Sequence, residues 1–82
     1  MRLTEDSIKQ FMSDSLAIDT APINAQTPLF SEGIIDSFAL VTLLTFVEES
    51  CGIRVRPDEV TLENFDSIER ILAFAQARVK GA

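Results

Sequence analysis

The residue with the clearest chemical potential is Ser37, which follows Asp36 where a loop containing proline and asparagine gives way to a strongly apolar helical pattern. This order predicts an exposed serine at a helix start, where free N–H groups and the helix dipole stabilise an attached anion by about 0.3–1 kcal/mol. A serine that attacks a substrate by itself needs a nearby base, usually histidine. The chain has no histidine, and Lys9 and Lys80 lie near opposite ends of the sequence. We therefore expect no catalytic residue, and a hydroxyl that another enzyme modifies.

A serine held in this way needs a framework of helices, and the sequence predicts an all-α fold: a small bundle of three main helices plus one short helix. The first helix is expected to follow Thr4 as N-cap, and a long loop from Asp19 to Ile35 comes after it. The apolar stripe of this helix contains Ile8, Phe11, Met12 and Leu16. Pro22 and Pro28 discourage regular structure in the loop. Its available anchors to the core are Ile23, Leu29, Phe30 and Ile34.

The second helix is expected from Ser37 to Cys51, with Gly52 as its left-handed C-terminal cap. At about 100° per residue, its core face contains Leu40, Leu43, Leu44, Val47 and Cys51. The other side contains Phe38, Thr42, Thr45 and Glu49, with Val41 and Glu48 along one flank. An aromatic ring is thus predicted to face solvent beside Ser37, the alternative being a ring folded back onto the loop. Phe46 should lie under a neighbouring loop or helix, and Cys51 should be a buried, inert thiol.

Two further helices complete the expected bundle. A short third helix is expected between Asp58 and Asn64, with Val60 and Leu62 pointing inward. The last helix begins near Asp66, which is followed three residues later by Glu69, the spacing of a capping box with Asp66 as N-cap. Its buried stripe should contain Ile68, Ile71, Leu72, Ala75 and Val79.

Length and composition limit the classes of function that fit. With 82 residues, of which 46% are hydrophobic and 24% charged, the range 1–82 is predicted to be a single folded domain. One cysteine and no histidine argue against a disulfide and against a metal site. No apolar run approaches the ~20 residues that span a bilayer, and the first residues lack the order of a secretory signal. The sequence thus predicts a cytoplasmic protein without a membrane partner.

Charge is unevenly distributed along the chain. The net charge of −6 argues against nucleic acid as a ligand. No basic residue lies between Lys9 and Arg54, whereas this interval contains Asp14, Asp19, Glu32, Asp36, Glu48 and Glu49. Such a field steers basic partner surfaces toward the segment around Ser37. The simpler interpretation is that acidic surfaces keep small domains soluble.

The residues around Ser37 carry a family resemblance. An Asp-Ser pair taken alone is more often a plain helix cap. Here Leu29-Phe30 and Gly33-Ile34-Ile35 precede Asp36-Ser37, and a leucine-rich helix follows. This arrangement resembles the attachment site of acyl and peptidyl carrier proteins, in which the serine holds a 4′-phosphopantetheine arm. The resemblance extends from about Thr27 to Val79.

The resemblance implies a non-catalytic carrier. A separate phosphopantetheinyl transferase would attach the covalent 4′-phosphopantetheine cofactor from coenzyme A to Ser37, and Asp36 would help that enzyme recognise the site. The arm would carry an aminoacyl or other short acyl group as a thioester, loaded by a ligase and delivered to downstream biosynthetic enzymes. The residues implied to contact these partners are Phe38, Val41, Thr42, Thr45, Glu48, Glu49 and Val55. A monomer is the simplest state, because an arm that visits several enzymes gains nothing from a buried interface.

Departures from the family pattern narrow the subclass. Phe38 stands where leucine or methionine is common, and Thr42 stands where carriers of fatty-acid synthesis commonly have an acid. The segment from Arg56 to Ile68 is more similar to discrete aminoacyl and peptidyl carriers, including D-alanyl carriers. The alternatives are a carrier of fatty-acid or polyketide synthesis and, in another class, an unmodified helical adaptor that binds a partner through the face bearing Phe38.

Overall fold

Helix boundaries in this protein follow local capping residues. The computed structural model describes residues 3–81 and contains α1 (Glu5–Leu16), α2 (Ser37–Cys51), a 3₁₀ turn η1 (Pro57–Glu59), α3 (Leu62–Phe65) and α4 (Ile68–Gly81). The Thr4 hydroxyl accepts the Ser7 N–H and the Ser7 hydroxyl accepts the Thr4 N–H, which forms a capping box. Helix α2 ends at Gly52, whose φ of 66° is left-handed as predicted. No strand occurs within residues 3–81, and the predicted all-α fold of three main helices and a short one is confirmed.

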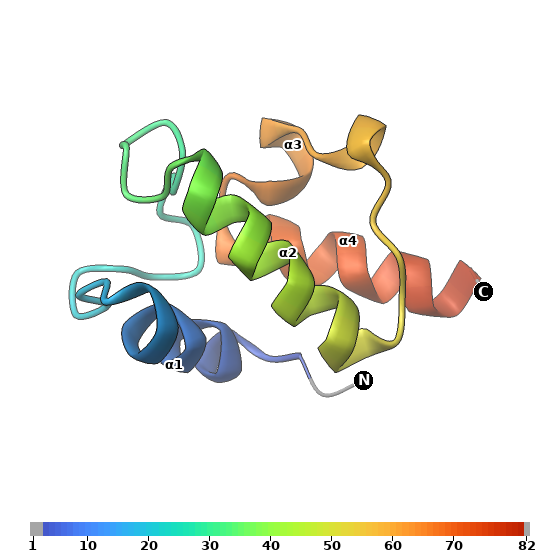
Figure 1. The fold of residues 1–82 in the computed structure, drawn as a ribbon, viewed down its shortest axis with the longest axis horizontal. Helices are drawn as coiled ribbons and strands as arrows, with labels where there is room; N and C mark the ends of the chain where they lie inside the picture. Colours follow the sequence, from blue (N-terminus) through green and yellow to red (C-terminus); the bar gives the residue numbers. More distant parts are fainter. Residues whose placement is uncertain (1–2, 82) are drawn as a thin grey trace.

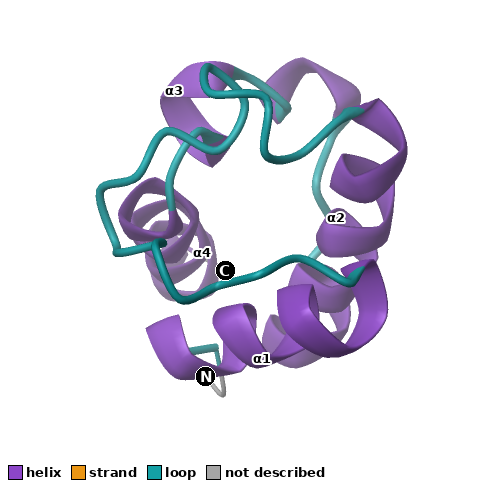
Figure 2. Cartoon of the chain, turned by 90° about the vertical axis from the view of Figure 1, so that its left-hand side faces the viewer, coloured by secondary structure: helices purple, strands orange, loops and turns teal. Residues whose placement is uncertain are grey.

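The three long helices pack around one core. Helices α1, α2 and α4 each contact the other two, and α3 packs against α4. Figure 1 shows α2 crossing in front of α4, with α1 below and α3 above. In Figure 2 the long loop between α1 and α2 crosses the end of the bundle that faces the viewer. The buried apolar residues are Leu3, Ile8, Met12, Ile23, Leu29, Ile35, Leu43, Val47, Phe65, Ile68, Ile71 and Ala75.

Each predicted apolar stripe faces the core, although the stripe of α2 is less deeply buried than expected. Leu43 and Val47 are fully buried, but Leu40, Leu44 and Cys51 are only half-buried. Cys51 packs against the core as expected but is only partly buried, and this burial raises the pKa of its thiol. The prediction that Phe46 lies under a neighbouring element is confirmed, because its ring stacks on that of Phe11 in α1 with centroids 4.4 Å apart. Their contact joins α2 to α1.

The predicted short third helix is present, but its expected bounds, Asp58 to Asn64, are wrong. Pro57 instead opens the separate turn η1, and Thr61 caps a new short helix by accepting the Asn64 N–H on its hydroxyl. Because α3 begins only at Leu62, that side chain lies on the outside and is 55% exposed, rather than pointing inward as expected. Phe65 is the residue of α3 that enters the core.

Candidate functional site

Ser37 is the first residue of α2, and its side chain is exposed. Asp36 precedes it as N-cap in an extended conformation, and Asp36 Oδ1 accepts the Ala39 N–H at 2.8 Å. The Asp36 carbonyl accepts the Leu40 N–H at 2.9 Å. Since the first N–H groups of a helix have no intrahelical acceptor, those of Ser37 and Phe38 stay available to an anion. The structure thus places the Ser37 hydroxyl in the open at a helix start, as the sequence predicted.

The turn that leads into α2 is closed by backbone hydrogen bonds. The Leu29 carbonyl accepts the N–H groups of Ile34 at 2.9 Å and Ile35 at 3.1 Å, and the Phe30 carbonyl accepts that of Gly33 at 3.0 Å. Gly33 has a φ of 73°, in the left-handed region that favours glycine. A Cβ at Gly33 would meet no atom within 4 Å, so glycine is favoured here by conformation and not by a close neighbour. Gly33 thus closes a tight turn directly before α2.

A carboxylate from the C-terminal half of the chain holds this turn. Asp66 Oδ1 accepts the N–H groups of Phe30 at 2.8 Å and Ser31 at 3.1 Å, and Asp66 Oδ2 accepts the Ser31 hydroxyl at 2.8 Å. The Asp66 carbonyl accepts the Leu29 N–H. Desolvation by itself would raise the pKa of Asp66, but the hydrogen bonds from Ser31 and Phe30 and the charge of Arg70 outweigh it and lower that pKa. We call the bonds from Leu29, Phe30 and Ser31 the Asp66 anchor.

The prediction that Asp66 caps α4 is wrong by one residue. Ser67 takes this role, because its Oγ accepts the Arg70 N–H at 3.2 Å. Asp66 itself ends α3 with helical backbone angles, which leaves its carboxylate free to reach the loop. Sequence analysis missed the Asp66 anchor, and its bonds to Phe30 and Ser31 join residues 36 and 35 positions apart, so no local spacing signals it.

The residues expected to contact partners fall into two groups, one on the exposed side of α2 and one where the chain leaves this helix. Phe38 is 80% exposed and Val41 is 63% exposed, which makes them two of the most exposed large apolar side chains of the described residues. Thr45 and Glu49 are also exposed, while Thr42 is half-buried. Thr42 and Thr45 donate their hydroxyls to the carbonyls one turn earlier. The predicted solvent-facing ring of Phe38 is therefore confirmed, and the alternative of a ring folded onto the loop is not.

Glu48 and Val55 form a second group with an internal contact. The Glu48 carboxylate accepts the Val55 N–H at 2.8 Å, and both residues are half-buried. This bond ties the segment after α2 back to the helix. The Glu48 carboxylate therefore has a structural role within the chain. The neighbouring Glu49 takes no part in this hydrogen bond.

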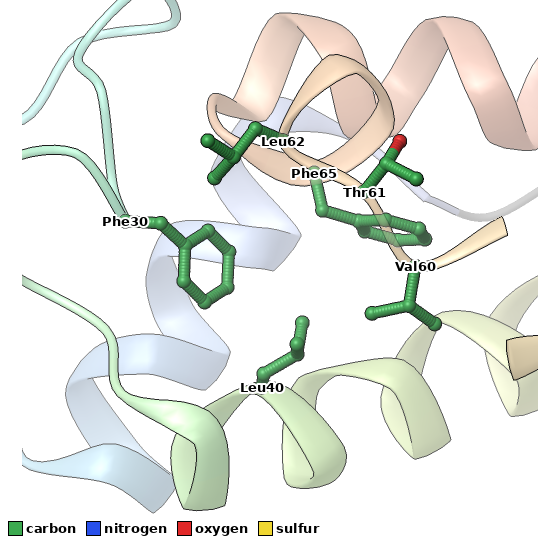
Figure 3. A pocket seen from close by; sticks show the side chains of 6 residues that line it. All are labelled: Phe30, Leu40, Val60, Thr61, Leu62 and Phe65. Atoms are coloured by element: carbon green, nitrogen blue, oxygen red, sulfur yellow. The ribbon is translucent and has the colours of Figure 1, made fainter. Parts of the chain in front are cut away.

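A small apolar cavity lies beside the start of α2. Its volume is about 150 Å³, and its lining is formed by Phe30, Leu40, Val60, Thr61, Leu62 and Phe65. Figure 3 shows these side chains converging from the long loop, from α2 and from the segment around α3. Leu40 lies one helical turn after Ser37, so the cavity opens near the candidate attachment residue. No sequence pattern indicates this cavity, because its walls come from three separate segments.

The described residues offer neither a metal-binding cluster nor a membrane-spanning helix. Within residues 3–81, no group of three or more His, Cys, Asp or Glu side chains is arranged to hold a metal ion. None of the helices in that range is both long and apolar enough to cross a membrane.

A phosphodiester-linked group on Ser37 fits the site, since the hydroxyl is exposed beside N–H groups that favour a negative charge.

Comparison with known sequences gives a consistent picture. The family profile described as "Phosphopantetheine attachment site" matches residues 6–75. A D-alanyl carrier protein from Abiotrophia defectiva is 32% identical over 72 residues, which cover 88% of this chain and 86% of that protein. A probable acyl carrier protein, PigG, from Serratia sp. is 30% identical over 54 residues, which cover 66% of this chain and 62% of that protein.

Solved structures add a similarity of fold. A chain in a structure described as "Crystal structure of FAD-dependent dehydrogenase" matches with a TM-score of 0.73 and 26% sequence identity. The match covers 83% of this chain and 97% of that chain. The matched chain therefore has this fold over nearly its whole length.

Proposed function

As a member of the phosphopantetheine attachment site family, this chain is a carrier protein, and we propose that Ser37 holds its 4′-phosphopantetheine arm. The observation that supports Ser37 is its exposed hydroxyl at the first position of α2. The phosphodiester would lie at the positive end of a 15-residue helix, where the N–H groups of Ser37 and Phe38 are available. When attached, the arm supplies a terminal thiol that carries the cargo as a thioester.

Attachment requires a separate phosphopantetheinyl transferase. Ser37 Oγ forms an ester bond to the phosphorus that bears the pantetheine of coenzyme A, the phosphoanhydride bond of coenzyme A breaks, and adenosine bisphosphate leaves. The serine proton passes to a base of the transferase, because the carrier offers no histidine of its own. Asp36 is exposed directly before Ser37, so its charge is accessible to that enzyme while its Oδ1 keeps the start of α2 in place.

The cargo we propose is an aminoacyl or other short acyl group. The similarity to a D-alanyl carrier protein, which covers 88% of the chain, supports the aminoacyl class. A loading ligase and downstream biosynthetic enzymes would then be the partners. The matching chain in a structure described as an FAD-dependent dehydrogenase adds a flavin-dependent dehydrogenase as a candidate downstream enzyme. Tethering raises the effective concentration of the cargo at each partner, provided that the carrier docks correctly.

Docking would use the exposed side of α2 next to Ser37. Phe38 and Val41 supply exposed apolar surface, and Glu49 supplies charge at the other end of the helix. The seven residues proposed for docking are Phe38, Val41, Thr42, Thr45, Glu48 and Glu49 on α2 and Val55 in the segment that follows it. Leu62 joins this set from α3, because it is also exposed and lies at the rim of the cavity beside α2.

The test is co-expression with a broad-specificity phosphopantetheinyl transferase, followed by intact-mass measurement. We expect wild type to gain the mass of one phosphopantetheinyl group and Ser37→Ala to gain none. Ser13→Ala is the matched control, because Ser13 is an exposed helical serine on α1, and it should be modified like wild type. An unmodified wild type, under conditions that load a known carrier, would favour a helical adaptor that never receives an arm.

A further inference from the structure

We propose that Asp66 is a positioning residue for attachment at Ser37: its carboxylate fixes the turn Leu29–Ile35, and with it the start of α2, against the junction of α3 and α4. This inference rests on Ser37 as the attachment residue. Asp66 lies between α3 and α4 and contacts neither Ser37 nor any reacting atom, so its influence acts through the loop.

The path from Asp66 to Ser37 is a short series of hydrogen bonds. The Asp66 anchor holds Leu29, Phe30 and Ser31. The Leu29 carbonyl then accepts the N–H groups of Ile34 and Ile35, which fixes the far end of the turn. The next residue is the N-cap Asp36, and Ser37 follows it. The carboxylate holds Phe30 and Ser31, and the backbone carbonyl of the same residue holds Leu29. Because Phe30 and Ser31 lie inside the turn that ends at Asp36, the carboxylate also limits where Ser37 can lie.

The other end of this path is firmly held. Arg70 on α4 donates to the Leu62 carbonyl at 3.3 Å, and Arg78 on α4 forms an ion pair with Glu59. These contacts fasten the segment that contains η1 and α3 to α4. The Ala25 carbonyl accepts the Glu69 N–H at 2.9 Å, which adds a second link between the long loop and the start of α4.

The chemistry of the anchor explains how one side chain can hold the turn. One oxygen serves two backbone N–H groups, and the other serves a hydroxyl, so a single side chain satisfies three donors. Hydrogen bonds to an ionised acceptor are shorter and stronger than neutral ones. Phe30, which receives part of this anchoring, also forms one wall of the cavity beside Leu40. Loss of the carboxylate would therefore loosen both the turn and that wall.

The experiment compares Asp66→Ala with Ser67→Ala and Asp66→Asn. Ser67→Ala removes the neighbouring α4 cap but no bond to the loop, so it controls for general destabilisation. Asp66→Asn keeps an oxygen that can accept both backbone N–H groups and should rescue most of the effect. Two quantities are measured: amide hydrogen exchange of Phe30 and Ser31 in the unmodified protein, and kcat and KM of a phosphopantetheinyl transferase for each carrier with coenzyme A.

For Asp66→Ala we expect faster exchange at both amides and a KM raised about tenfold with kcat nearly unchanged, because the competent loop conformation is less populated. Ser67→Ala should show neither change. Equal exchange and equal KM in Asp66→Ala and Ser67→Ala would overturn the inference. If Asp66→Ala does not fold, Ser31→Ala takes its place, because it removes one of the three bonds to the carboxylate. We then expect a smaller rise in KM, and a KM equal to that of wild type would overturn the inference. A wild type that accepts no phosphopantetheine would count against Ser37, whereas the exchange measurement would still report on the anchor.

Discussion

Replacing Phe38 by alanine should separate partner recognition from stability. Phe38 is 80% exposed, so about a fifth of its side chain is covered, whereas Phe65 is 1% exposed. Full burial of a phenylalanine side chain contributes roughly 1.5–3 kcal/mol, and a fifth of that is roughly 0.3–0.6 kcal/mol. Truncation of a buried phenylalanine costs about 3–5 kcal/mol, because a cavity is left as well. Phe65→Ala is therefore the positive control for a loss of packing.

These free energies translate into melting temperatures that circular dichroism resolves easily. A domain of this size shifts its Tm by roughly 4–8 °C for each kcal/mol. We expect Phe38→Ala to melt less than about 5 °C below wild type, and Phe65→Ala to melt more than about 12 °C below it or to be unfolded. A loss near that of Phe65→Ala would show that the ring of Phe38 packs on the fold.

The same substitution should slow transfer by partner enzymes. An exposed aromatic ring that becomes buried at an interface contributes about 2 kcal/mol or more to binding, and 2 kcal/mol corresponds to roughly 30-fold in kcat/KM. The assay is the rate of phosphopantetheine attachment to Phe38→Ala, followed by the rate of cargo loading. Gln76→Ala, at an exposed position on α4, is the control and should react like wild type. Wild-type rates in Phe38→Ala would remove this ring from the docking face.

Two further predictions concern stability. Ala17 ends α1 with a left-handed φ of 55°, so Ala17→Gly should raise the unfolding free energy by roughly 1 kcal/mol in urea titrations, and a loss of stability would contradict this. The hydrogen bond and charge of Arg78, with the Arg56 N–H, lower the pKa of Glu59, so its stabilising effect is present above the ordinary glutamate pKa of about 4.3 and is lost as pH falls through the lower folded pKa. Unfolding measured across the acid range should therefore show a shallower decline for Glu59→Gln, and equal slopes would refute the role of this pair.

Features set by neighbouring residues could be predicted from the sequence. The caps of α1 and α2 each depend on side chains within a few residues, as in the bond from Ala39 to Asp36. The exposed ring of Phe38 followed from helical periodicity alone, because a solvent face is defined by the same angle as the core face. The start of α2 and the position of Ser37 were predictable for this reason.

Features set by competition between adjacent signals were harder to predict. Asp66 and Ser67 are both good N-caps, and the Asp66–Glu69 spacing favoured the wrong one. The structure resolves the choice because Asp66 is already engaged by the loop, which leaves Ser67 as the cap. The same difficulty affected the third helix, where Pro57 and Thr61 each open a short element and only the second contributes a side chain to the core.

The two aspartates near the site show why the unpredicted part matters for function. Asp36 acts on residues three and four positions away, and it fixes the direction in which α2 begins. Asp66 acts across more than thirty residues, and it fixes where that beginning lies relative to α3 and α4. A carrier without a catalytic base contributes position and presentation to the chemistry of its partners. Position and presentation both depend on how the attachment residue lies relative to the docking face. Asp36 sets the direction of α2 through local bonds, whereas the place of α2 relative to α3 and α4 depends on the Asp66 contact, which no local pattern encodes.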